Sequence, residues 1–218
     1  MKKASVMASL LLVVLLFAHA DDAHAQQTTP SEPPSSAAPA ASPNRPPQEE
    51  RETMPAANPA DVSSIDNILR ALYESVSGAA GERRDEKRFR SLFVPGARLI
   101  PTAPRPDGGA TARVFDVDEF YQRVNKNTEK MGFYEKEIAR QTQIYGNIAH
   151  IFSTYEARRA ANDPAPFVRG INSIQLLKDG QRWWVVTVYW DAERPGNTIP
   201  DEYLPKTSNR KRATPKEK

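Results

Sequence analysis

The stretch that decides the fold is residues 170–190, GINSIQLLKDGQRWWVVTVYW. It contains two runs of β-forming residues joined by Asp179-Gly180, and Asp-Gly is one of the strongest two-residue hairpin signals. A turn of two residues sets Leu176 opposite Trp183. Both faces of this hairpin are apolar at their centres, so we expect the sheet to be covered on both sides.

Alternation along each strand sorts this hairpin into two faces. The face expected to point into the domain carries Asn172, Ile174, Leu176, Trp183, Val185, Thr187 and Tyr189. The outer face of the second strand is strongly apolar, and soluble monomers rarely expose such a patch. We therefore expect a homodimer interface, or alternatively cover by a tail, at Trp184, Val186, Val188 and Trp190.

A second and longer hairpin is predicted over residues 134–158, around a Gly-Asn turn at its middle. Pairing outward from that turn sets Arg140 opposite Ser153 and Ile138 opposite Tyr155 on the more apolar face. We take this face as inward. The opposite, outer face then carries Gln141, Gln143, His150 and Phe152.

Helices are expected before the two hairpins. Apolar residues recur at helical spacing, Asp61 or Ser63 is a candidate cap of the first helix, and Asp116 begins a sequence that resembles a capping box. The predicted elements are helices at 61–76, 85–94 and 116–130, a short strand at 97–102 and a turn-rich loop at 103–112.

The N-terminus has the layout of a bacterial secretory signal peptide at residues 1–25. Two lysines precede a short apolar run, and small residues stand at the cleavage positions after Ala25 or, second, Ala20. Retention as a membrane anchor is the alternative. We expect a periplasmic or secreted protein that has no membrane association after cleavage.

The rest of the chain divides by composition. Residues 26–60 are rich in Pro, Ala and Ser and are expected to be a disordered linker. The folded domain is expected at 61–195, and a basic, disordered tail at 196–218. The formal net charge of +3 comes largely from that tail, so we expect no nucleic-acid partner. The absence of cysteine excludes disulfides and thiolate metal sites.

Three segments together resemble the nuclear transport factor 2-like superfamily, which includes SnoaL-like and ketosteroid-isomerase-like domains. They are residues 89–97 (FRSLFVPGA), 147–156 (NIAHIFSTYE) and 180–190 (GQRWWVVTVYW). The resemblance implies an α+β fold: three N-terminal helices packed on a curved, mainly antiparallel sheet, which form a cone with one pocket. It also implies that dimerisation through the outer face of the sheet is common. It does not imply one activity, because this fold hosts enzymes and binding modules alike.

The catalytic residues known in the superfamily have no counterpart in this sequence. In its isomerases, an aspartate that acts as the general base lies on the strand that reads RLIPT here, at residues 98–102. A protonated aspartic acid lies at the place where Asn172 and Ser173 stand in this sequence. Its dehydratases use an interior histidine, whereas His150 is expected on the outer face. Catalytic residues therefore stay unassigned, and no cofactor or metal site is expected.

A group of inward polar residues is the candidate binding site. A few convergent polar groups in an apolar cavity are typical of a small-molecule site. Structural roles are the alternative: a cross-strand pair of Asn172 with Thr187, and a salt bridge from Arg140 to Glu74. The candidate pocket residues are Arg140, Ser153, Tyr155, Asn172, Thr187, Tyr189 and Trp183.

The sequence therefore predicts an exported domain that binds a small molecule in its cone or acts as an interaction module. The runner-up is an isomerase, dehydratase or hydrolase of a small hydrophobic substrate in the same pocket. An envelope assembly domain is a third possibility, favoured only by the proline-rich linker.

Overall fold

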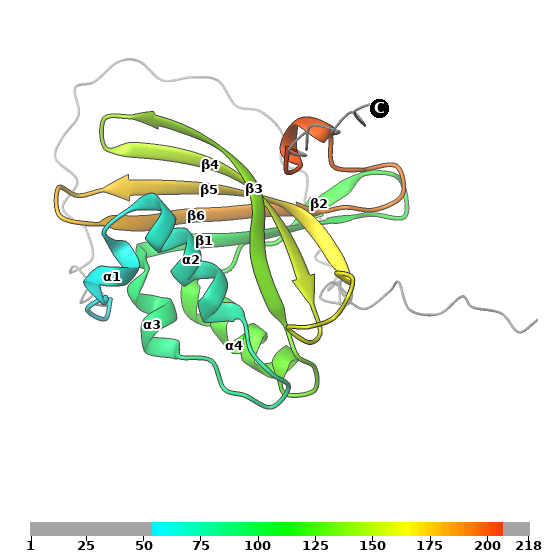
Figure 1. Ribbon diagram of the computed structural model, residues 1–218, viewed down its shortest axis with the longest axis horizontal. Helices are drawn as coiled ribbons and strands as arrows, with labels where there is room; N and C mark the ends of the chain where they lie inside the picture. The colour runs from blue at the N-terminus through cyan, green and yellow to red at the C-terminus, as the bar shows by residue number, and fades with distance from the viewer. Residues whose placement is uncertain (1–53, 207–218) are drawn as a thin grey trace, which may run out of the picture. The chain divides into compact units, whose positions relative to one another are not determined.

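A six-stranded mixed sheet with helices packed against one face makes up the domain (Figure 1). The computed structural model describes residues 54–206, which belong to the second of two units, residues 51–218. The strand order is β2-β1-β6-β5-β4-β3, and all pairings are antiparallel except β1 with β6. The elements are α1 Pro59–Val62, α2 Ile65–Val76, α3 Glu86–Ser91, β1 Phe93–Pro104, β2 Ala110–Ala112, α4 Val117–Thr128, β3 Tyr134–Tyr145, β4 Ile148–Arg158, β5 Val168–Lys178, β6 Trp183–Ala192 and the 3-10 helix η1 Asp201–Tyr203. The predicted α+β fold class is confirmed.

The core lies between the helices and what we call the inner face of the sheet. Helix α2 crosses β3 and β6, and α4 packs on β1. Burying this apolar surface stabilises the domain by roughly 25 cal/mol per Å² removed from water. The largest fully buried side chains are Tyr121, Phe89, Phe93, Phe115, Ile68, Leu69, Leu92, Ile151, Ile174, Leu176, Val185 and Thr154.

Side-chain caps fix where the helices begin. Asp116 accepts a hydrogen bond from the Glu119 amide at 2.7 Å, so the predicted cap of α4 is confirmed. The predicted cap of the first helix is wrong, because Asn58 caps α1 and Ser64 caps α2. Asp61 instead lies within α1.

Arg84 closes the loop that follows α2. Only 5% of this residue is exposed, and its guanidinium donates hydrogen bonds to the carbonyl oxygens of Val76, Gly78, Ala79 and Glu82. These include carbonyls at the C-terminal end of the helix, which have no partner within it. Arg84 therefore fixes the end of α2 and the loop that follows it, residues 76–82.

The predicted register of the 134–158 hairpin is confirmed near its turn and shifted beyond it. Arg140 lies opposite Ser153 as predicted. A β-bulge at Ile138 then sets Glu137, and not Ile138, opposite Tyr155. A bulge adds one residue to one strand, so every side chain beyond it changes face.

The predicted register of the 170–190 hairpin is wrong by two residues at the turn. Asp179 accepts hydrogen bonds from the amides of Gln181 and Arg182, and the longer turn sets Leu177 opposite Trp184. A second bulge, at Val186, shifts the pairing by one more residue.

Two segments depart from the predicted boundaries. Residues 103–112, predicted as a loop, form a hairpin in which the end of β1 pairs with β2. Residues 196–206, placed in a disordered tail by the sequence prediction, include η1 on the outer face of the sheet, where the Tyr203 ring packs edge-on against Phe152 with ring centroids 5.0 Å apart. The Thr154 hydroxyl donates to the Tyr203 carbonyl at 2.6 Å.

The predicted signal peptide and most of the linker lie outside the described residues, as does the tail beyond residue 206. Among residues 54–206, no helix is both long enough and apolar enough to span a bilayer.

Candidate functional site

Polar side chains from α2, β3, β4 and β5 converge on the inner face of the sheet. Ser153 and Asn172 lie opposite each other on β4 and β5, and Tyr155 lies one inward position further along β4. The hydroxyl of Tyr73, on α2, lies within hydrogen-bonding distance of both Ser153 and Asn172. We call this group the inner cluster; its members are Tyr73, Glu135, Glu137, Ser153, Tyr155 and Asn172.

A directed chain of hydrogen bonds runs through the inner cluster. The Asn172 side-chain amide donates to the Tyr73 hydroxyl at 3.1 Å, and the Ser153 hydroxyl donates to Glu137 at 2.5 Å. The Tyr73 and Ser153 hydroxyl oxygens are 2.7 Å apart. Since the Ser153 proton is directed to Glu137, the Tyr73 hydroxyl is the donor to Ser153. The chain fixes the orientation of all four side chains.

Arg140 lies at the rim of the inner cluster and binds two carboxylates. Its Nε is 3.4 Å from Glu137, and its terminal nitrogen pairs with Asp66 of α2. The predicted salt bridge to Glu74 is wrong, because Glu74 pairs with Arg88 at 2.7 Å. Arg140 is thus a paired rim residue, as the structural alternative required.

Glu135 is the member whose protonation changes near neutral pH. Burial raises the pKa of its carboxyl to about 7, and the 3.5 Å hydrogen bond from Asn172 offsets this only in part. Within residues 54–206 this carboxyl has no ion pair. Burial also raises the pKa of Glu137, which Ser153 and Arg140 partly counter.

The two tyrosines keep their protons throughout the physiological range. Burial, followed by the charge of Glu135, raises the pKa values of Tyr73 and Tyr155. The Tyr155 hydroxyl lies against Gly170 of the neighbouring strand. No hydrogen bond holds this hydroxyl in the part of the chain that the structure describes.

Gly170 is required for the position of Tyr155. An added Cβ would lie 2.5 Å from the Asp191 carbonyl oxygen and 2.6 Å from the Tyr155 hydroxyl. We expect Gly170→Ala to lower the free energy of unfolding by about 1–3 kcal/mol in urea denaturation, since close-packed sites absorb extra atoms poorly. Adding Tyr155→Phe should restore part of that loss, because it removes the hydroxyl, which makes one of the three close contacts. A single variant as stable as the wild type would contradict this packing.

The structure brings some of the predicted pocket residues together and separates others. Arg140, Ser153, Tyr155 and Asn172 lie at or beside the inner cluster, as described above. Trp183 is buried on the inner face but sits seven residues along β6 from the Asn172 row, roughly 23 Å at 3.3 Å per residue.

Two predicted pocket residues lie on the wrong face for that role. Thr187 pairs with Gln175, and Tyr189 pairs with Ser173, in rows that belong to the outer face. Tyr189 is 45% exposed. The bulge at Val186 causes this reversal, because it exchanges the faces of the later β6 residues. The predicted cross-strand pair of Asn172 and Thr187 is also wrong, because the longer turn and the bulge together set Asn172 opposite Trp190.

Sequence reasoning missed Tyr73, Glu135 and Glu137. Tyr73 carried a usable signal: it stands four residues after Leu69 and three before Val76, on the apolar face of α2. The two glutamates carried none. Alternation counted from the turn places both on the outer face, and only the bulge at Ile138 brings them inward.

The bulge at Val186 in β6 also moves two residues of the predicted dimer surface to the inner face. Val188 is buried at 6% exposure, and Trp190 packs edge-on against Phe120 with ring centroids 5.7 Å apart. Both residues therefore belong to the inner face and the core. Trp184 stays on the outer face, where Arg182 stacks 3.6 Å above its ring. Homodimerisation through Trp184 and Val186 stays a prediction.

His150 lies on the outer face, as the hairpin register predicted. It pairs with Gln143 and Gln175, and its Nε2 is 3.0 Å from the Ser173 hydroxyl. Among the described residues, no three His, Cys, Asp or Glu side chains gather closely enough to hold a metal ion.

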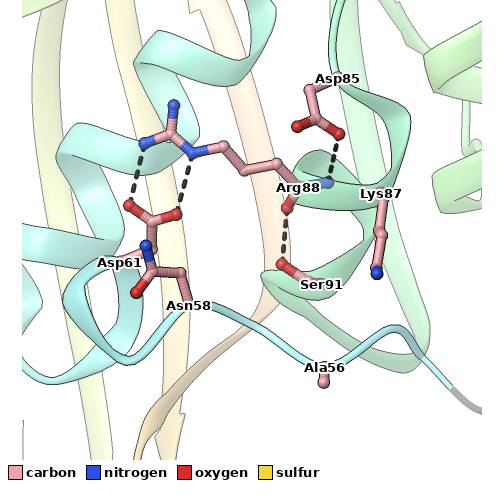
Figure 2. A pocket seen from close by; sticks show the side chains of 7 residues that line it. All are labelled: Ala56, Asn58, Asp61, Asp85, Lys87, Arg88 and Ser91. Carbon is pink, nitrogen blue, oxygen red and sulfur yellow. Dashed lines mark hydrogen bonds and ion pairs between the residues drawn. The ribbon is translucent and has the colours of Figure 1, made fainter.

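A separate surface groove of about 290 Å³ lies beside α1 and α3 (Figure 2). Figure 2 shows the Arg88 guanidinium facing Asp61, to which it donates two hydrogen bonds of 2.9 Å. These bonds hold the pKa of Asp61 below its usual range. The charges of this pair satisfy each other, which makes the groove a weaker candidate than the inner cluster. Its lining residues are Ala56, Asn58, Asp61, Asp85, Lys87, Arg88 and Ser91.

Comparisons with known proteins give distant structural similarities only. No protein-family model matches the sequence, and no curated protein matches it. The chain is similar to solved structures of NTF2-like proteins of unknown function from Shewanella baltica (16% identity, 60% of this chain and 91% of that one, TM-score 0.40) and Silicibacter pomeroyi (12%, 60% and 94%, TM-score 0.42). It is also similar to a Nostoc punctiforme protein of unknown function with a cystatin-like fold (11%, 59% and 88%, TM-score 0.46).

With identities of 16% or lower and TM-scores below 0.5, these similarities carry no argument about this chain. The function has to be argued from the side chains of this chain.

Proposed function

We propose that this protein binds a small molecule at the inner cluster. The observation that supports this proposal is the Glu135 carboxyl, which is desolvated and has no cationic partner within residues 54–206. An ionised carboxyl in such a place costs free energy unless a complementary group meets it. A ligand would supply that group and would contact the free Tyr155 hydroxyl beside it.

Export of the domain belongs to the same proposal. It is supported only by the sequence of residues 1–25, with its two lysines, short apolar run and alanine cleavage positions. Fractionation of cells that express the full chain, with N-terminal sequencing of the product, tests it. A product in the periplasm or medium that begins at residue 26 or 21 is expected. Retention of the whole chain in the cytoplasm would contradict export.

Binding at the inner cluster is tested by titrating the isotope-labelled full chain with a chemically mixed set of small fragments. We expect amide NMR signals of residues 135–137, 153–155 and 170–172 to shift in a saturable way with at least one fragment class. Tyr155→Phe should weaken that binding, since it removes one hydrogen bond of about 1 kcal/mol. Shifts confined to the groove beside α1 and α3, or none at all, would contradict the proposal.

An enzyme that acts on a small hydrophobic substrate is the second candidate, and the pKa of Glu135 favours it. A carboxyl that exchanges its proton near pH 7 is suited to general acid–base catalysis. In an isomerase, dehydratase or hydrolase, Glu135 would move the proton while Tyr155 and Asn172 orient the substrate. Turnover that Glu135→Gln abolishes, with fragment binding retained, would separate this candidate from a binding protein.

A further inference from the structure

The inner cluster and its rim carry more negative than positive charge. The carboxylates are Glu135, Glu137 and Asp66, and among residues 54–206 the only cation that pairs with any of them is Arg140. Arg140 is already shared between Glu137 and Asp66. With all three carboxyls ionised, the group has a net charge of −2, from three negative charges and one positive charge.

Hydrogen-bond acceptors are also in excess around Glu135. Its carboxyl receives one bond, the 3.5 Å contact from Asn172, although an ionised carboxylate has about four lone-pair sites. Glu137 faces Tyr155 directly across the β3–β4 ladder, a spacing of about 5 Å between Cβ atoms. Glu135 lies two residues along the same strand face, so three acceptors surround one small region.

We propose that the ligand of the inner cluster is an organic amine in its protonated form. An ammonium group has three N–H donors and no acceptor, which matches the acceptors of Glu135, Glu137 and Tyr155. Its charge offsets the excess negative charge of the cluster. This inference rests on the proposed function, because it specifies the chemistry of a ligand for the same site.

An ammonium ligand and a proton would compete for Glu135. The titratable groups that face Glu135 directly are Tyr73 from α2 and Tyr155 from β4. The charged groups next to these are Asp66 from α2, Glu137 and Arg140 from β3, and Asp191 from β6. Burial raises the pKa values of Tyr73 and Tyr155, so both hydroxyls keep their protons, and it raises the pKa of Glu137 in the same direction as that of Glu135. Glu135 therefore sets the pH dependence, and binding of an amine should strengthen as the pH rises through about 7.

The test uses three probes of similar size and different charge: benzylamine, benzyl alcohol and benzoate. Binding to the full chain is followed by amide NMR shifts at residues 135–137 and by titration calorimetry. At about pH 8 we expect benzylamine to bind at least roughly tenfold more tightly than either other probe. At about pH 5.5 its affinity should fall by up to roughly thirtyfold, which is the loss of ionised Glu135 for a pKa of about 7.

Two variants of the same hairpin serve as test and control. Glu135→Gln should weaken benzylamine binding at least roughly tenfold at about pH 8 and remove its pH dependence. Glu156→Gln removes the same charge from the outer face of the neighbouring strand, where Glu156 pairs with Lys136, and should leave binding unchanged.

The outcomes separate this inference from the proposed function. If benzyl alcohol or benzoate shifts the cluster signals as strongly as benzylamine, or if Glu135→Gln leaves benzylamine binding intact, the amine inference is wrong and small-molecule binding stands. If neither these probes nor the mixed fragment set shifts the cluster signals, both proposals are wrong.

Discussion

Between pH 4.5 and about 7 the protein is expected to lose roughly 3 kcal/mol of its free energy of unfolding as the pH rises. Burial raises the pKa of Glu135 from 4.5 in the unfolded chain to about 7 in the folded one. In this interval the folded state holds the proton and the unfolded state releases it. The stabilisation is therefore complete below pH 4.5 and is lost as the pH rises through 7.

The other carboxyls with shifted pKa values do not reverse this decrease of stability with rising pH. The pKa of Glu137 is also raised by burial, so it adds a loss in the same direction. Asp61 and Glu156 have lowered pKa values, and their contributions disappear only at lower pH. Their effect therefore lies below the interval in which Glu135 titrates.

Urea denaturation of the wild type and two variants at several pH values checks this prediction. Glu135→Gln should remove most of the decrease in the free energy of unfolding between pH 4.5 and 7, because an amide does not titrate. Glu156→Gln should keep it, since Glu156 lies on the outer face. A wild-type stability that rises between pH 4.5 and 7 would show that Glu135 is not desolvated in the folded protein.

Replacing Arg84 with alanine is expected to lower the free energy of unfolding by about 3–5 kcal/mol. The substitution removes hydrogen bonds to four carbonyl oxygens and leaves a void where a residue exposed by only 5% had been. Most of this loss in the free energy of unfolding comes from the buried carbonyl oxygens that are left without donors, since a cavity alone costs less. Arg84→Lys should be intermediate, because an ammonium cannot reproduce the planar fork.

The neighbouring residue provides a matched control. Arg83 has a side chain that is 80% exposed and a single 3.5 Å contact with Glu86. Arg83→Ala should change stability by less than about 0.5 kcal/mol in the same urea measurements. Equal effects of the two alanine variants would mean that Arg84 does not hold the end of α2.

The parts of the fold that depend on local patterns were predictable from the sequence. Helical spacing and the Asp116 cap located α4, and the Gly-Asn turn gave the right partners for residues 140–144 of β3. Arg140 and Ser153 were correctly placed inward, because no bulge separates them from the Gly-Asn turn that fixed their register. Asn172 was also correctly placed, because the error at the second turn is an even shift of two residues, which does not change the face. The α+β architecture followed from the same signals.

The rest failed where period-two alternation was interrupted. The bulges at Ile138 and Val186 have no composition signal, and each exchanges the faces of the residues beyond it. This error hid both glutamates of the inner cluster and displaced Thr187 and Tyr189 to the wrong side. The side chain of Asp179 lengthened the second turn by accepting two backbone amides, a local competition that the Asp-Gly pair alone does not reveal.

The bulge at Ile138 makes the interior of this domain sensitive to chain length as well as to residue identity. Deleting Glu137 while the bulge stays would bring Lys136 opposite Tyr155 and Tyr134 opposite Ala157, the positions that Glu137 and Glu135 now hold. The acidic interior would become basic and aromatic without a single substitution. A gain or loss of one codon in β3 is therefore a short evolutionary route between ligands of opposite charge on an otherwise unaltered scaffold.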